Sequence, residues 1–116
     1  MDNRLSMEVG MDACCASLKS NLTMVPYSVM VEIFGEPNGQ CDDYKTDVEW
    51  CGELDGDVFT IYNWKNGYNY RGGKGIAVKD MTEWHVGGIK ESIGLRIKQY
   101  ILEYCIEHAP NVRMKI

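Results

Sequence analysis

Apolar residues recur at helical spacing near the C-terminal end of the chain. From residue 89 to residue 108 they stand three or four positions apart, and Pro110 follows shortly afterwards. Such spacing places one apolar stripe along a helix and turns the charged residues between them toward water. The pattern predicts a long helix over 89–108, with a buried stripe of Ile89, Ile93, Ile97, Tyr100, Ile101, Tyr104 and Cys105.

A shorter apolar run, Tyr27–Phe34, follows Pro26 and precedes Gly35 and Pro37. Proline near the start of a helix and glycine just past its end are typical boundaries. The β-branched residues of the run also permit a strand. The boundaries favour a helix over 27–34.

Period-two alternation marks the middle of the chain. Residues 46–53 and 57–64 are strand-like and flank Leu54-Asp55-Gly56, which predicts a β-hairpin over 46–64. Both faces of its second strand carry bulky residues. We therefore expect that strand to be central in the sheet and covered on each side by a helix or by another subunit.

A third strand is expected near 81–86, after which Gly87-Gly88 would turn the chain into the long helix. Residues 1–22 have a weaker pattern. They suggest either a short helix over 13–18, capped by Asp12, or an N-terminal extension that becomes ordered against a partner.

The elements predict one α+β domain over residues 1–116. A small antiparallel sheet, made of the hairpin 46–64 and the strand near 81–86, would cradle the long C-terminal helix and the helix 27–34. The length suffices for a single hydrophobic core but not for two.

Composition narrows the classes of function. With 12 basic and 17 acidic residues the net charge is −5, which argues against binding to nucleic acid polymers. We expect no secretory signal and no membrane span, because no apolar run is long enough. Five cysteines without a C-x-x-C pair fit reduced cytoplasmic thiols, so neither a disulfide framework nor a metal site is expected.

Local charge differs from this acidic average. The stretch from Tyr62 to Lys79 contains four basic residues, no acidic residue, and several aromatic, asparagine and glycine residues. Rings can stack on a base, Arg and Lys can meet phosphates, and Asn can bond base edges. A solvated loop whose tyrosines pack on the sheet is the alternative. The expected ligand-binding residues here are Tyr62, Trp64, Asn69, Tyr70, Arg71 and Lys74, with the backbone amides of 72–75 as further anion donors.

A second candidate region is Trp84–Gly88, expected where a strand meets the first turn of the long helix. Unpaired amides at a helix N-terminus attract anions, so we add His85, Gly88 and Arg96 to the ligand-binding residues. Trp84 as a core residue, His85 as a satisfied polar residue and Arg96 as a solvated surface residue are the alternatives. No catalytic residue is predicted, because no nucleophile has local support.

The carboxylates of residues 42–57 suit a solvated outer face of the hairpin and its turn. Their spacing does not match a calcium-binding loop. Mimicry of a nucleic acid backbone is the functional alternative.

Three short motifs carry a resemblance to a known family. They are Phe34-Gly35-Glu36-Pro37, Thr60-Ile61-Tyr62-Asn63-Trp64-Lys65 and Thr82-Glu83-Trp84-His85-Val86-Gly87-Gly88. With the hairpin between the first two, the chain resembles small phage-encoded proteins of the Thoeris anti-defence type over roughly residues 27–108. The resemblance implies an antiparallel sheet cradling C-terminal helices, homodimers that can assemble further, and an intact cyclic ADP-ribose isomer held at a subunit interface. It also implies that some members bind cyclic di- or trinucleotides at a separate site.

We therefore expect a non-catalytic phage anti-defence protein that sequesters a cyclic nucleotide immune signal in the cytoplasm of the infected bacterial host. The expected partners are the cyclic nucleotide and further copies of the chain, with no cofactor, nucleic acid polymer or membrane. Two alternatives remain open. One is an enzyme that degrades such a signal with His85 as acid or base, and the other is an acidic inhibitor of a bacterial defence nuclease.

Overall fold

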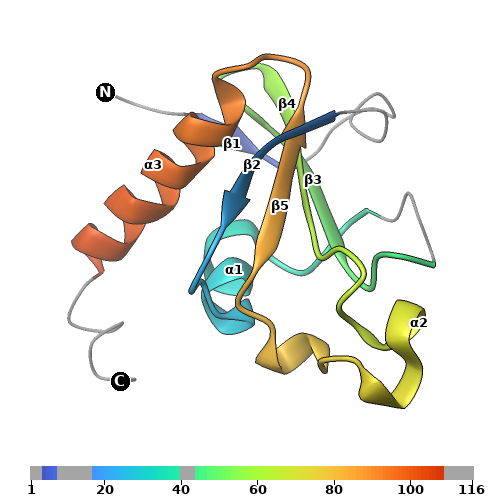
Figure 1. The fold of residues 1–116 in the computed structure, drawn as a ribbon. Helices are drawn as coiled ribbons and strands as arrows, with labels where there is room; N and C mark the ends of the chain where they lie inside the picture. The colour runs from blue at the N-terminus through green and yellow to red at the C-terminus, as the bar shows by residue number, and fades with distance from the viewer. Residues whose placement is uncertain (1–3, 8–16, 40–43, 109–116) are drawn as a thin grey trace.

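The fold consists of one five-stranded sheet, the two longer helices α1 and α3 that pack on it, and shorter helical segments beyond the ends of the strands (Figure 1). The structure, a computed structural model, describes residues 4–7, 17–39 and 44–108. The sheet has the strand order β1-β3-β4-β5-β2, and all neighbouring strands are antiparallel. This confirms the predicted α+β class. The elements are β1 (Leu5–Ser6), β2 (Ser17–Leu22), α1 (Tyr27–Phe34), β3 (Glu49–Leu54), β4 (Asp57–Tyr62), α2 (Tyr68–Arg71), η2 (Gly72–Lys74), η3 (Val78–Asp80), β5 (Trp84–Gly88) and α3 (Ile93–Glu107).

Asp55 and Gly56 form the turn that joins β3 to β4. Their φ angles are positive, 53° and 85°, as in the two-residue turns that preserve the twist of a hairpin. Glycine takes this conformation without steric cost. β4 lies between β3 and β5, and Tyr62 stands opposite His85. The predicted hairpin and the central position of its second strand are confirmed.

The core lies between one face of the sheet and the two longer helices, α1 and α3. Phe59 of β4 is fully buried, and the ring of Phe34 from α1 lies 5.8 Å from its ring. Burial of each large apolar side chain favours folding by about 1.5–3 kcal/mol, so this layer holds the fold together. The core residues are Leu22, Met30, Phe34, Trp50, Leu54, Phe59, Ile61, Met81, Trp84, Val86, Ile93, Ile97 and Ile101.

Two buried tryptophans connect the sheet to the ends of α1. Trp50 and Trp84 meet edge to face, with ring centroids 5.3 Å apart. Each indole N–H has a partner, because Trp50 Nε1 donates to the carbonyl of Gly35 and Trp84 Nε1 to that of Val25. Trp84 is therefore a core residue, which is the alternative given above for Trp84 in the Trp84–Gly88 motif.

The long helix begins later than the spacing predicts. α3 starts at Ile93 rather than at residue 89, and Ile89 is 68% exposed, so Ile89 is not part of the buried stripe. Ile93, Ile97 and Ile101 are buried as expected.

The preceding strand is also shifted. β5 covers residues 84–88 rather than 81–86, and Gly87 and Gly88 extend it instead of turning the chain. Both glycines pair with β4 on one side and with β2 on the other. A Cβ atom on Gly88 would overlap with the side chain of Ile93, so the glycine allows the first turn of α3 to lie against the end of the strand.

Residues 17–22 form an edge strand of the sheet. The predicted short helix over 13–18 is wrong for its last two residues, which pair with β5, and residues 13–16 lie outside the described residues. At the opposite edge, Leu5–Ser6 pairs with β3. The described parts of residues 1–22 thus add a strand at each edge of the sheet.

The second face of the sheet carries polar residues. Thr60, Glu49 and Cys51 are buried there, whereas Tyr62 is half-buried. Burial raises the pKa of the Cys51 thiol to about 12, and the charge of Glu49 adds to this effect. The expectation that the hairpin carboxylates face water is wrong for Glu49, because this face of the hairpin is covered near β3.

Candidate ligand-binding site

Three aromatic rings meet where β4 ends. Tyr62 and His85 stand opposite each other in the β4–β5 pair, and their ring centroids are 5.5 Å apart. Trp64 follows two residues after Tyr62, at 6.0 Å from the Tyr62 ring and 6.3 Å from the His85 ring. The Trp64 and His85 planes are inclined by only 26°. The antiparallel register thus gathers three residues that the sequence predicts as ligand contacts.

The rings of Tyr62 and His85 are uncharged at neutral pH. Burial lowers the pKa of His85 below its ordinary value of 6.5, which keeps the imidazole neutral. Burial also raises the pKa of Tyr62, and the charge of Glu49 raises it further. Trp64 is 37% exposed. The cluster therefore offers a partly open aromatic surface on which another flat ring can stack.

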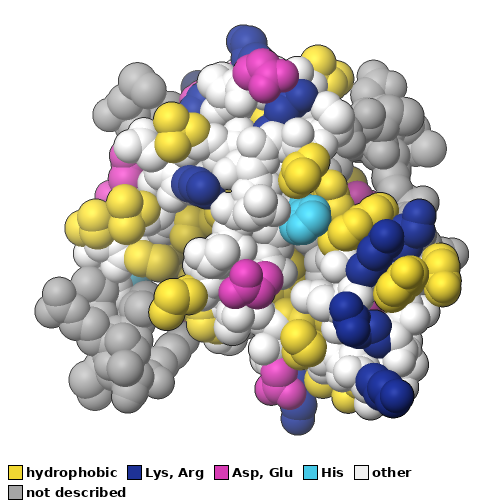
Figure 2. Space-filling model, in the orientation of Figure 1, with side chains coloured by type: hydrophobic (Ala, Val, Ile, Leu, Met, Phe, Trp, Pro, Cys, Tyr) yellow, Lys and Arg dark blue, Asp and Glu magenta, His cyan; other side chains and the backbone are white. Residues whose placement is uncertain are grey.

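Two lysines lie beside this surface. Lys45 Nζ is 5.4 Å from the centroid of Trp64, and Lys65 Nζ is 5.8 Å from it. Lys65 Nζ is also 5.5 Å from the ring of Tyr70, which in turn lies 5.0 Å from that of Tyr44. Figure 2 shows Lys and Arg side chains gathered among hydrophobic ones on the α2 side of the molecule. Aromatic faces and ammonium groups together suit an anionic ligand that has a flat ring.

Asn69 and Arg71, both predicted ligand contacts, also support the loop itself. Asn69 Nδ2 donates to the carbonyl of Thr46, and Arg71 Nε donates to the carbonyl of Lys65 at 2.8 Å. Both residues are exposed and belong to α2. Lys74 is exposed as well, at the end of η2.

The glycine turn after α2 uses some of its amides internally. The N–H of Gly72 donates to the carbonyl of Tyr68, and that of Gly75 donates to Gly72. Gly72 has a φ angle of 61°, which favours glycine. Two of the four amides expected to meet an anion are therefore already bonded within the turn.

Gly88 and Arg96 lie at the other end of the β4–β5 pair. Gly88 pairs with Phe59, three residues along the strand from the pair of His85 and Tyr62, or roughly 10 Å away. Arg96 Nη1 donates to Asp57 Oδ2 at 2.7 Å, and Arg96 Nη2 donates to the carbonyl of Leu54 at 3.0 Å. The structure does not bring these two candidates to the rings. The expectation that His85 lies at a helix N-terminus is wrong, because α3 begins only after the far end of β5.

The carboxylates of the hairpin have internal partners. Asp57 and Asp55 form ion pairs with Arg96, at 2.7 and 3.6 Å. Asp47 accepts a hydrogen bond from Asn63. Asp42 and Asp43 lie outside the described residues. This use of Asp47, Asp55 and Asp57 in the fold offers no support for a nucleic-acid-mimicking face.

Three residues near the rings, Lys45, Lys65 and Tyr44, are not among the predicted ligand contacts. Lys65 directly follows Trp64, and that adjacency was a usable signal. Lys45 stands alone among the acidic residues 42–57, so nothing in its surroundings along the chain pointed to the rings. Only folding of the hairpin brings it there.

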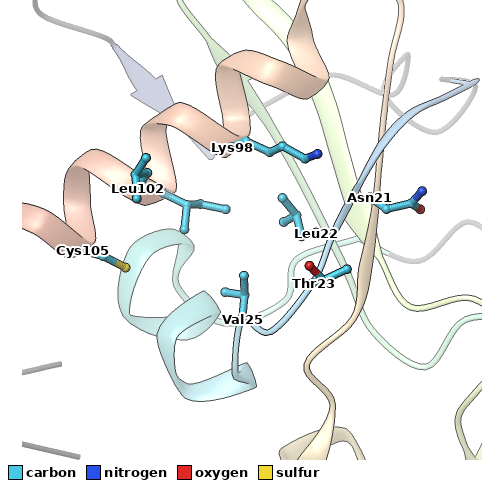
Figure 3. A pocket seen from close by; sticks show the side chains of 8 residues that line it. Asn21, Leu22, Thr23, Val25, Lys98, Leu102 and Cys105 are labelled. Carbon is cyan, nitrogen blue, oxygen red and sulfur yellow. The ribbon is translucent and has the colours of Figure 1, made fainter. Parts of the chain in front are cut away.

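The structure also has a groove away from the rings (Figure 3). It has a volume of about 370 Å³ and lies between α3 and the chain that leads from β2 to α1. None of the predicted site residues lines it. Its lining residues are Asn21, Leu22, Thr23, Val25, Lys98, Ile101, Leu102 and Cys105.

The fold and the site define a small α+β protein with an aromatic and basic surface site. No protein-family model, curated protein or solved structure matches the chain. Among the described residues, no group of three or more His, Cys, Asp or Glu side chains could hold a metal ion. None of the described helices has the length and apolar character needed to cross a bilayer.

Proposed function

We propose that this protein is a non-catalytic phage anti-defence protein that binds and sequesters a cyclic nucleotide immune signal. The proposed ligand is a cyclic ADP-ribose isomer, with cyclic oligonucleotides as a further class, and the proposed location is the cytoplasm of the infected bacterial host. The observation that supports it most is the ring cluster of Tyr62, Trp64 and His85, with Lys45 and Lys65 beside Trp64.

The chemistry of the cluster matches such a ligand. An adenine base stacks on an aromatic face, and each stacked base contributes about 1–3 kcal/mol to binding. The two lysines can meet the pyrophosphate. Sequestration depends on slow release rather than on a chemical step, and neutral rings that exclude water from a stacked base favour slow release. The resemblance of the three motifs to the Thoeris anti-defence family directs the choice of ligand.

The proposal is tested by a thermal-shift screen followed by calorimetry. Cyclic ADP-ribose isomers, cyclic dinucleotides and cyclic trinucleotides are each added to the protein, with linear ADP-ribose as the matched control. A ligand at 100 times its Kd should stabilise the protein by about 2.7 kcal/mol. Absence of a shift with every cyclic compound would refute the proposed function.

The neutral imidazole of His85 beside Tyr62 also supports the alternative of an enzyme that degrades the signal. The two functions differ in what happens to the ligand. After incubation and heat denaturation of the protein, a sequestering protein releases the ligand with unchanged mass. A changed mass that disappears in His85→Gln would establish the enzyme instead.

The proposal includes a homodimer or a larger homo-oligomer. In the described part of the chain β2 is at the edge of the sheet, and its Leu18 is more than half exposed. Leu95, Leu102 and Ile106 of α3 are also more than half exposed. Two copies of an edge strand pair antiparallel about a twofold axis, so the same residues serve both sides. Light scattering at micromolar concentration should show at least a dimer, and Leu102→Glu should shift it toward a monomer. A monomeric wild-type protein would exclude this part of the proposal.

A further inference from the structure

Asn63 is a fully buried polar residue directly before Trp64. Its Oδ1 accepts the backbone N–H groups of Asp47 and Val48, at 2.8 and 3.0 Å. Its Nδ2 donates to Asp47 Oδ1 at 2.9 Å and to Asn66 Oδ1 at 3.0 Å. These four bonds use the full hydrogen-bonding capacity of an amide side chain. The surroundings of residue 63 therefore match an asparagine at every polar atom.

The carboxylate of Asp47 extends the connection to α2. While Oδ1 accepts from Asn63, Oδ2 accepts the backbone N–H of Asn69 at 3.2 Å. A Cβ atom on Gly67 would overlap with this carboxylate. Asp47 therefore sits directly against the backbone that begins α2.

The two residues join two segments that are distant in sequence. Residues 44–48 carry Lys45, and residues 63–71 carry Trp64 and Lys65. The backbone N–H of Lys65 donates to the carbonyl of Lys45 at 2.8 Å where the two segments meet. The contacts of the lysines with Trp64 thus arise beside the Asp47–Asn63 pair.

We infer that Asp47 and Asn63 are positioning residues for the ligand-binding site, holding the two segments so that Lys45 and Lys65 lie beside Trp64. The inference rests on the proposed function for the role of the site, but the pairing itself can be measured without a ligand.

Charge makes the inference testable. A carboxylate near an anion-binding site repels the ligand, so charge alone predicts that Asp47→Asn binds an anionic nucleotide more tightly. An Asn side chain, however, turns its amide NH2 group toward one of the two N–H groups that donate to Asp47. Positioning therefore predicts weaker binding, by about tenfold. The two effects have opposite signs.

Two further variants separate charge from geometry. Gly67→Ala displaces the carboxylate without changing the net charge and should also weaken binding by about tenfold. Asp80→Asn removes a negative charge from an exposed residue of η3 and serves as the matched control. We expect its affinity within about twofold of the wild type.

An exchange of the two side chains provides the rescue. In the double variant Asp47→Asn with Asn63→Asp, the carboxylate at position 63 would accept both backbone N–H groups. The amide of Asn66, whose Oδ1 accepts from Asn63 in the wild type, would turn over and donate its Nδ2 to that carboxylate. The amide at position 47 would donate to that carboxylate and accept from Asn69. Asn63→Asp alone places two carboxylates face to face. We expect the double variant to bind within about threefold of the wild type, unlike either single variant.

Hydrogen exchange tests the pairing without a ligand. The amides of Asn69 and Lys65, which bond across the two segments, should exchange about tenfold faster in each single variant and recover in the double variant. If Asn63→Asp fails to fold, recovery of a folded double variant supports the pairing equally.

Unchanged exchange in Asp47→Asn, tighter nucleotide binding by it, or no rescue in the double variant would overturn the inference. If no nucleotide binds the wild-type protein, the proposed function fails while the exchange rates still decide the pairing.

Discussion

The two ends of the β4–β5 pair use basic residues in different ways. At the Asp57 end, the guanidinium of Arg96 bonds a carboxylate and a backbone carbonyl. At the Tyr62 end, the ammonium group of Lys65 lies beside the rings of Trp64 and Tyr70. A carboxylate cancels the charge of its partner, whereas an aromatic face attracts a cation and leaves its charge in place. The partner, rather than the basic residue, therefore separates a structural cation from one that can serve a ligand.

Trp64→Ala should produce the largest effect, because it removes the ring at the centre of the site. We expect nucleotide binding to weaken by about 10- to 100-fold, the value of one stacked base. Calorimetry measures the loss. Tyr68→Ala, which truncates an exposed aromatic residue of α2, is the control and should retain near-normal affinity. Equal losses in both variants would show that the site is not centred on Trp64.

Arg96→Met tests the opposite end. We expect the free energy of unfolding to fall by about 1–2 kcal/mol, because partly buried charged hydrogen bonds are lost, while nucleotide affinity stays unchanged. Urea denaturation measures the first quantity. Lys98→Met changes an exposed basic residue of the same helix for which no ion pair is found among the described residues, and should change stability by less than about 0.5 kcal/mol. A loss of nucleotide affinity in Arg96→Met would show that Arg96 contributes to ligand binding.

The same variant has a defined pH dependence. The hydrogen bond from Arg96 lowers the pKa of Asp57 below its ordinary value of 3.8, and the charge of Lys90 contributes. A lowered carboxyl pKa stabilises the folded state above the unfolded value, and this contribution is lost as the pH falls through the lowered pKa. The difference between wild type and Arg96→Met should therefore shrink below about pH 4. A constant difference down to pH 2 would contradict the ion pair as its source.

Lys65→Gln and Lys74→Gln together compare two lysines. The structure places Lys65 beside Trp64, whereas Lys74 is a candidate from the sequence alone. In Lys65→Gln we expect affinity to fall by about three- to tenfold and the salt dependence of binding to decrease. Lys74→Gln, from the exposed end of η2, should remain within about twofold of the wild type. Calorimetry over a range of salt concentrations measures both. A larger effect in Lys74→Gln would favour the glycine turn over the rings as the anion site.

His85 should give the smallest effect. Burial lowers the pKa of His85, so the unfolded chain binds a proton more readily than the folded protein. The stability from the neutral ring is complete above the unfolded value of 6.5 and is lost as the pH falls below it. The urea midpoint of the wild type should therefore decline modestly from pH 7 to pH 5, and less so in His85→Gln. His108→Gln is the control, and a flatter profile in that variant would assign the effect elsewhere.

The sequence predicts those parts of the fold that depend on local signals. Pro26 and Gly35 bound α1 at the predicted residues, and Asp55-Gly56 forms the predicted turn. The start of α3 could not be predicted in this way. It depends on the approach of Ile93 to Gly88, a contact across a turn that helical spacing does not encode. β2 was missed for a related reason, since its pairing with β5 joins residues more than 60 positions apart.

The candidate site shows the same division. Tyr62, Trp64 and His85 were predicted because ring residues are recognisable in a sequence, and the β4–β5 register brings them together. Lys45 comes to lie at the site only because its segment contacts Lys65 in the folded structure. Arg96 was predicted as a ligand contact but pairs with Asp55 and Asp57 instead. These partners stand about 40 residues earlier in the chain, so the local sequence around Arg96 does not reveal them.

The uneven exposure of the three tryptophans gives the protein an internal optical reporter. Trp50 and Trp84 are fully buried, and Trp64, at the proposed site, is 37% exposed. Iodide in solution should therefore quench the fluorescence of Trp64 and spare the other two. A base stacked on Trp64 would shield it, so unlabelled protein in a cuvette can report occupancy of the site.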